Sequence, residues 1–158
     1  GYLKSRDGKT HAFEMRFGRA YPLEPPEFEW LTPITHPNIE PPKPEGAGRI
    51  CVPPLTDPCL WSPDTSVNAI IEEAFYVLSN PNPNDPMGHR TCLTEAIRML
   101  EEEISKRSMS SLDLQKVRTL LTGAKQSLQR TSLSSSPDKR AYDLVKEAGR
   151  LLASAKKG

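Results

Sequence analysis

Hydrophobic and polar residues alternate in two short runs near the start of the chain, over residues 12–17 and 27–31. The apolar positions are Phe13, Met15 and Phe17 in the first run, and Phe28 and Trp30 in the second. Strict alternation with aromatic residues is typical of half-buried strands. Residues 1–10 are polar and turn-like, and Asp7-Gly8 within them is a typical hairpin turn. The pattern predicts an antiparallel meander with one wet, acidic face.

Later segments of the chain repeat their apolar residues with the period of an amphipathic helix. The stripes are Val67, Ile70, Ile71, Ala74, Phe75 and Leu78; Leu93, Ala96, Ile97, Leu100 and Ile104; Leu114, Val117, Leu120, Leu121, Ala124 and Leu128; and Ala141, Leu144, Val145, Ala148, Leu151 and Leu152. The first helix follows the candidate caps Asp64, Thr65 and Ser66, and we expect it to pack on the sheet. The last is predicted to begin at residues 136–138, where Ser-Pro-Asp places proline at the first helical position.

Proline and charge divide the chain at the same place. Of the 16 prolines, 15 precede residue 88, so loops and strands are expected before that point and helices after it. Residues 1–87 carry 7 Lys and Arg against 12 Asp and Glu, whereas residues 88–158 carry 14 against 8. An acidic front and a basic tail indicate two units with different surfaces.

The whole-chain numbers exclude several classes of partner. A net charge of +1 gives no reason to expect nucleic acid, and no apolar run is long enough to span a bilayer. The 3 cysteines have no framework spacing, so thiols in a reducing compartment, cytoplasmic or nuclear, are expected.

The stretch from His36 to Cys51 holds the best candidates for chemistry. His36-Pro37-Asn38-Ile39 leads through a proline-rich loop to Gly48-Arg49-Ile50-Cys51, which combines a thiol with a side-chain amide. Taken alone, the cysteine is more often a buried small hydrophobe, and Asn38 is more often a turn residue. A zinc site of Cys51, Cys59 and His36 lacks paired short cysteine spacing, so no metal is expected.

Short proline-rich motifs follow one another in a fixed order over roughly residues 11–87. They are Tyr21-Pro22-x-x-Pro25-Pro26, His36-Pro37-Asn38-Ile39, Gly48-x-Ile50-Cys51, Trp61-Ser62-Pro63 and Asn82-Pro83-Asn84-Asp85-Pro86. Each is weak alone, but together the motifs resemble the core of the ubiquitin-conjugating enzyme family. The resemblance implies an α+β fold, with a four-stranded antiparallel meander sheet packed by helices and followed by extra C-terminal helices. It also implies a core over residues 1–110 that lacks the family's N-terminal helix and about one strand, and a helical extension over residues 111–158.

The resemblance further implies a thioester mechanism. Cys51 would accept ubiquitin, or a ubiquitin-like protein, from an activating enzyme and pass it to a substrate lysine. Asn38 matches the asparagine that supports the oxyanion or the loop. Asp85 matches an acidic position that orients the incoming amine, although before a proline it could also be a simple turn residue. His36 and Pro37 are expected to be structural at the site.

The expected partners follow from the same resemblance. A ligase would contact two loops, where Leu23, Ser62 and Pro63 match the family's positions. Leu23 stands where many members carry phenylalanine, which favours RING-type over HECT-type ligases. The transfer needs no cofactor, because ATP is used only by the upstream activating enzyme. The alternative is a catalytically weak scaffold or adaptor that binds ubiquitin or a ligase.

Two features depart from the family pattern. The loop between Asn38 and Cys51 is longer than usual and contains Pro41, Pro42 and Pro44, so it either shifts Asn38 relative to the thiol or adds specificity. The tail is basic, and its last helix is either a solvated face or a docking site for an acidic partner.

Overall fold

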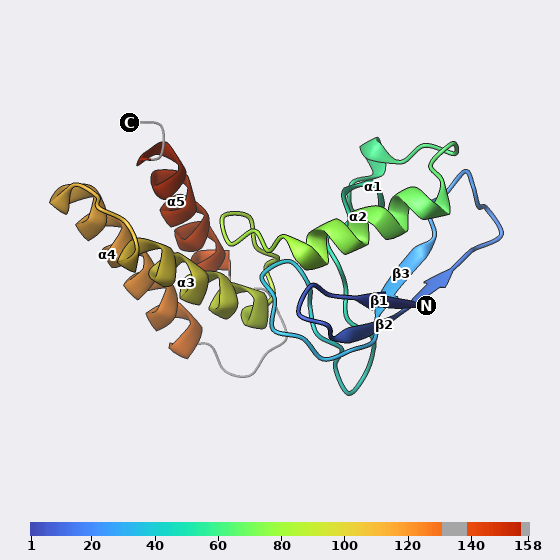
Figure 1. The fold of residues 1–158 in the computed structure, drawn as a ribbon, viewed down its shortest axis with the longest axis horizontal. Helices are drawn as coiled ribbons and strands as arrows, with labels where there is room; N and C mark the ends of the chain where they lie inside the picture. Colours follow the sequence, from blue (N-terminus) through green and yellow to red (C-terminus); the bar gives the residue numbers. More distant parts are fainter. Residues whose placement is uncertain (131–138, 156–158) are drawn as a thin grey trace. The chain divides into compact units, whose positions relative to one another are not determined.

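The computed structural model of the chain describes residues 1–130 and 139–155. The chain divides into two compact units, Gly1–Pro81 and Asn82–Gly158, and each has its own hydrophobic core (Figure 1). The first unit combines strands and helices, whereas the helices described in the second are α3, α4 and α5. The α+β fold expected from the resemblance is therefore confirmed.

The sheet of the first unit is an antiparallel meander. Its strands are β1 (Tyr2–Lys4), β2 (Thr10–Arg16) and β3 (Glu27–Trp30), paired in the order β1-β2-β3. The hairpin turn predicted at Asp7-Gly8 joins the first two strands. Gly8 donates a 2.9 Å hydrogen bond to the Ser5 carbonyl and has a φ of 85°, a conformation that favours glycine.

Details of the sheet differ from the sequence prediction. β1 lies in residues for which the sequence predicts a turn-like structure. The prediction misses this strand because it has only three residues, with Leu3 as the buried one, and is too short to show alternation. β2 ends at Arg16, so Phe17 lies outside it and is exposed. The sheet in the described part of the chain has three strands rather than four. In the place of a fourth strand, Gly48 forms an isolated antiparallel bridge with Trp30.

The helices of the first unit are α1 (Pro53–Thr56), the 3-10 turn η1 (Pro58–Leu60) and α2 (Val67–Ser79). Of the candidate caps, the Ser66 hydroxyl accepts a 3.1 Å hydrogen bond from the Ala69 amide. The core of this unit contains Leu3, Phe13, Trp30, Ile39, Ile50, Val52, Ile70, Ala74 and Leu78. The predicted stripe of α2 was too wide, because its buried residues recur at every fourth position, which leaves Phe75 41% exposed.

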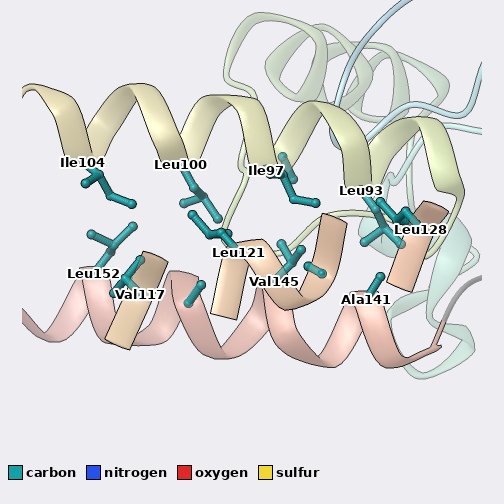
Figure 2. Close-up of a cluster of buried hydrophobic side chains, with 13 residues drawn as sticks. Leu93, Ile97, Leu100, Ile104, Val117, Leu121, Leu128, Ala141, Val145 and Leu152 are labelled. Atoms are coloured by element: carbon teal, nitrogen blue, oxygen red, sulfur yellow. The ribbon is translucent and has the colours of Figure 1, made fainter. Parts of the chain in front are cut away.

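The second unit is a three-helix assembly of α3 (Arg90–Ser105), α4 (Ser111–Arg130) and α5 (Lys139–Ala155). Figure 2 shows how side chains from the three helices point toward one another and share one core. The core consists of Leu93, Ala96, Ile97, Leu100, Ile104, Val117, Leu121, Ala124, Leu128, Ala141, Val145, Ala148 and Leu152. The stripe predicted for α3 is confirmed in full, and Leu114, Leu120, Leu144 and Leu151 lie half-buried at its margin.

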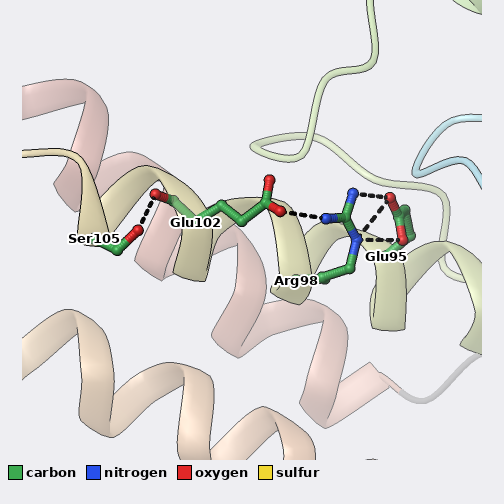
Figure 3. A network of polar contacts seen from close by, with 4 residues as sticks. All are labelled: Glu95, Arg98, Glu102 and Ser105. Carbon is green, nitrogen blue, oxygen red and sulfur yellow. Dashed lines mark hydrogen bonds and ion pairs between the residues drawn. The ribbon is translucent and has the colours of Figure 1, made fainter.

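The division of core and extension after residue 110 stays a prediction, and the boundary between the two compact units lies elsewhere. Since the apolar face of α3 belongs to the core of α4 and α5, the first unit ends at Pro81. The predicted start of the last helix at residues 136–138 lies outside the described residues. On the solvent side of α3, Arg98 joins Glu95 and Glu102 in a polar network (Figure 3). None of the helices described is both long enough and apolar enough to cross a membrane.

Candidate functional site

Residues 36–52 fold into a hairpin that places Asn38 directly opposite Cys51. The Cys51 amide donates a 3.1 Å hydrogen bond to the Asn38 carbonyl, and Ile39 bridges Ile50 in the next position. Farther along the hairpin, Lys43 and Gly46 exchange hydrogen bonds of 2.7 and 3.1 Å between their backbones. The additional residues of this loop therefore form the far end of the hairpin, and they do not separate Asn38 from the thiol.

The turn that begins the hairpin is buried and internally hydrogen-bonded. The backbone amide of Asn38 donates a 3.0 Å bond to Nδ1 of His36, so this nitrogen acts as an acceptor. His36 and Asn38 are each 6% exposed, and Pro37 is buried between them. A buried histidine that accepts from the backbone fixes the direction in which residue 38 leaves the turn. This is the kind of loop hydrogen bond expected of a structural histidine.

Gly48 lets the two arms of the hairpin approach each other closely. A Cβ at this position would lie 2.1 Å from the Glu40 carbonyl oxygen, a distance that no side chain tolerates. Gly48 also exchanges two backbone hydrogen bonds with Trp30, of 2.9 and 2.7 Å, which ties the hairpin to β3. The glycine of the Gly-x-Ile-Cys motif is thus required by the packing of backbone against backbone.

An ion pair adds a clamp between the two arms. Arg49 donates from Nε and from one terminal nitrogen to the two carboxylate oxygens of Glu40, at 2.8 Å each. The Glu40 side chain is 7% exposed, and such two-pronged contacts fix geometry as well as charge. Sequence reasoning missed this pair. Its signal was the opposite charges at positions that face each other once the hairpin register is known.

Cys51 is half-buried at the end of the hairpin and immediately before the fully buried Val52. Val52 is the N-cap residue of α1, and Pro53 occupies the first helical turn, where proline is well tolerated. Cys51 therefore lies at the junction between the hairpin and α1 and is only partly buried. Of the other cysteines, Cys59 is exposed and Cys92 is buried. Among residues 1–130 and 139–155, no group of three or more His, Cys, Asp or Glu side chains is placed to hold a metal ion.

The two predicted ligase-binding loops come together in the first unit. The indole nitrogen of Trp61 donates a 3.0 Å hydrogen bond to the Pro22 carbonyl, and the rings of Tyr21 and Trp61 lie 6.4 Å apart. Leu23 is 76% exposed beside this junction. In the second loop, Ser62 and Pro63 are also exposed. The structure thus shows a joined pair of loops that presents an apolar side chain to solvent.

Asp85 belongs to the second unit, in the proline-rich segment before α3. Its carboxylate is exposed and forms an ion pair with Lys146 of α5. The role expected for Asp85, orienting the incoming amine, stays a prediction, because Asp85 and Cys51 lie in different compact units. The contact with Lys146 had no signal in the sequence, since 61 positions separate the two residues.

Comparisons with known proteins agree with the family resemblance that the sequence motifs indicate. The model of the family described as "Ubiquitin-conjugating enzyme" matches residues 7–109. "Ubiquitin-conjugating enzyme E2 T" of Danio rerio is 35% identical over 83 residues, which are 51% of this chain and 40% of that protein. The human protein of the same name is 41% identical over 69 residues, 42% of this chain and 32% of that protein. "Probable ubiquitin-conjugating enzyme E2 31" of Arabidopsis thaliana is 35% identical over 81 residues, 51% of this chain and 48% of that protein. The matches thus span between about a third and a half of the length of these relatives.

Proposed function

Because the chain belongs to the ubiquitin-conjugating enzyme family, we propose that it carries ubiquitin, or a ubiquitin-like protein, as a thioester on Cys51 and transfers it to a substrate lysine. The observation that carries the proposal is the hydrogen bond between the Cys51 amide and the Asn38 carbonyl. It places a half-buried thiol and a side-chain amide on facing positions of one rigid hairpin.

The proposed reaction has two steps of acyl transfer. In the first, the Cys51 thiol loses its proton and its sulfur attacks the thioester carbonyl of the modifier on the activating enzyme. A new C–S bond forms, the old one breaks, and the activating enzyme's cysteine leaves as a thiolate that takes up a proton. In the second, a substrate lysine amine attacks; a C–N bond forms, the Cys51 thiolate leaves, and the amine loses a proton. A thioester is already activated, so the transfer itself needs no metal, nucleotide or other cofactor. ATP is consumed upstream, by the activating enzyme.

Asn38 and Asp85 have separate roles in the second step. Attack of the amine places negative charge on the carbonyl oxygen, and the Asn38 side-chain amide donates a hydrogen bond to it. Asp85 receives the incoming ammonium and helps it to lose a proton. His36 and Pro37 act indirectly, because they hold the turn from which Asn38 projects.

The joined loops of Leu23 and Trp61 are the proposed ligase-binding surface. A protruding leucine beside exposed Ser62 and Pro63 offers a small apolar knob for a groove on the partner. A leucine at this position favours a RING-type ligase over a HECT-type ligase. The three thiols accord with a reducing, cytoplasmic or nuclear location.

A loading assay tests the first step. The full chain is incubated with activating enzyme, ATP and ubiquitin, and the products are separated on a non-reducing gel. We expect an adduct that disappears with reductant, is absent from Cys51→Ala, and is retained in Cys59→Ala, which removes an exposed thiol outside the hairpin. No adduct, or an adduct that survives Cys51→Ala, overturns the proposal. A chain that then still binds a ligase would be an adaptor.

A discharge assay tests Asn38. Asn38→Ala should load Cys51 almost normally, whereas discharge to free lysine should slow by about 10²–10³, the loss typical of an oxyanion donor. An equal loss of both steps would mean that Asn38 only holds the loop.

A further inference from the structure

α5 carries two neighbouring stripes with different tasks. Ala141, Val145, Ala148 and Leu152 form the stripe that is buried in the core with α3 and α4. Tyr142, Lys146 and Gly149 follow one position later each and therefore form a parallel stripe about 100° around the helix. The core anchors the helix, so the position of the second stripe is fixed by the packing of the first.

The second stripe lies against the proline-rich segment that contains Asp85. Lys146 Nζ pairs with the Asp85 carboxylate, and the same ammonium lies 5.7 Å from the centre of the Tyr142 ring. One turn farther on, a Cβ at Gly149 would lie 2.9 Å from Cα and 2.7 Å from Oδ1 of Asn84. The helix backbone is thus in close contact with the residue before Asp85. An ion pair and a close backbone approach thus both join this segment to α5.

The chemistry of the ionic contact is that of a lysine on a carboxylate. The hydrogen bond to Asp85 raises the pKa of Lys146, so its amine stays protonated. The pair is open to solvent, with side-chain exposures of 40% for Lys146 and 63% for Asp85. An exposed pair of this kind is weak and exchanges readily with another cation.

We propose that Lys146 is an intrachain competitor for the substrate lysine, because it occupies the Asp85 carboxylate. The inference rests on the proposed function, in which Asp85 receives the incoming ammonium. Lys146 places an identical group on that carboxylate before any substrate arrives. A substrate lysine must displace Lys146 from the carboxylate or share the carboxylate with it. Sharing is unfavourable, because the positive charge of Lys146 repels the positive charge of the substrate lysine. The substrates favoured by this arrangement are those whose lysine is held by other contacts as well, rather than free amines.

The experiment compares Lys146→Gln with two matched variants of the full chain. Lys146→Arg keeps a cation at the same place, and Lys139→Gln removes an exposed lysine from the first turn of the same helix. Each protein is first loaded with ubiquitin, and its discharge is then measured against increasing concentrations of free L-lysine. We expect Lys146→Gln to lower the KM for lysine by up to about five-fold, the range for an exposed ion pair, with kcat nearly unchanged. Lys146→Arg and Lys139→Gln should retain the parental KM.

A second measurement follows the contact without ubiquitin. L-lysine is titrated into each isotopically labelled protein, and the amide signals of Asn84 and Asp85 are recorded by NMR. Half-maximal shifts should require less lysine in Lys146→Gln than in the parent or in Lys146→Arg. Loading with an unchanged KM in Lys146→Gln overturns the inference and leaves the proposed function standing. Failure to load overturns the proposed function, and the NMR titration then decides whether Lys146 still competes at Asp85. Equal titrations overturn that competition as well.

Discussion

Replacing Gly48 with alanine tests whether the close approach of the two hairpin arms holds the site together. The new Cβ would lie 2.1 Å from the Glu40 carbonyl oxygen, 2.8 Å from the carbonyl carbon of Pro41 and 2.9 Å from the Pro42 nitrogen. All three are backbone atoms, so no side-chain rotation relieves the clash. The arm that contains residue 48 has to move by about 1 Å or more before the Cβ reaches ordinary van der Waals contact.

The cost follows from the hydrogen bonds that such a movement disrupts. Gly48 and Trp30 exchange two backbone bonds, of 2.9 and 2.7 Å, and Trp30 is fully buried. A backbone hydrogen bond contributes about 1 kcal/mol net, and a buried group left unsatisfied costs about 1–3 kcal/mol. The free energy of unfolding of the first unit should therefore fall by about 2–4 kcal/mol, a large part of the roughly 5–15 kcal/mol of an ordinary domain.

Tryptophan fluorescence during urea unfolding is the suitable assay. The 2 tryptophans, Trp30 and Trp61, both lie in the first unit, so their emission reports that unit and not the three-helix assembly. Gly46→Ala is the matched control, because a Cβ there meets no atom within 4 Å. The control should change the free energy of unfolding by less than about 0.5 kcal/mol.

The two variants must differ for the reasoning to hold. Similar unfolding midpoints for Gly48→Ala and Gly46→Ala would show that the arms separate without cost, and the rigid hairpin would then be a wrong description. Thioester loading on Cys51 provides a second readout. It should fall in Gly48→Ala, where the partner strand of Asn38 is displaced, and be retained in Gly46→Ala.

Three further predictions concern packing and charge elsewhere. Gly149→Ala should destabilise the second unit, because the new Cβ would lie 2.9 Å from the Asn84 backbone. Gly123→Ala should stabilise the same unit by about 0.5–1 kcal/mol, because the new Cβ would meet only the end of the Leu144 side chain, at 3.3 Å. Thermal unfolding followed by circular dichroism distinguishes the two variants. Leu100→Ala, at a fully buried position, should cost about 2–5 kcal/mol in the same assay. Burial lowers the pKa of His11 below 6.5, so the unfolded chain takes up the proton more readily, and the first unit should lose stability as the pH falls below that value; His11→Gln should reduce this loss in urea unfolding compared at about pH 7.5 and pH 5.5.

Periodicity predicted the elements whose burial is decided locally. Every apolar position of the α3 stripe is buried, because one face of a long amphipathic helix has to pack somewhere. Periodicity failed where the burial of a segment depends on the element that packs against it. β1 exists because residues 2–4 pair with β2, and Phe75 is exposed because the surface against which α2 packs accepts a narrower face. The spacing of apolar residues within a segment therefore predicts neither the pairing of β1 nor the exposure of Phe75.

The motifs predicted the residues of the candidate site but not the contacts that hold them. Cys51, Asn38 and His36 were found from their order along the chain, and the structure places all three in one hairpin. The ion pair of Asp85 with Lys146 could not be predicted from the sequence, because Lys146 lies in a helix far along the chain. Only the packing of α5 in the core of the second unit directs Lys146 toward Asp85.

The hairpin also explains how a long loop is compatible with a fixed site. The register between Asn38 and Cys51 is set by the bond between their backbones and by the bridge of Ile39 with Ile50. Gly48 then secures the returning arm to β3 through Trp30. The additional residues lie beyond these contacts, around the pair of Lys43 and Gly46, so their number has no effect on the register. The length of a loop sets the entropy cost of closing it, and this cost grows only slowly with length. The geometry of the site depends instead on the contacts between the two arms of the hairpin near Asn38 and Cys51.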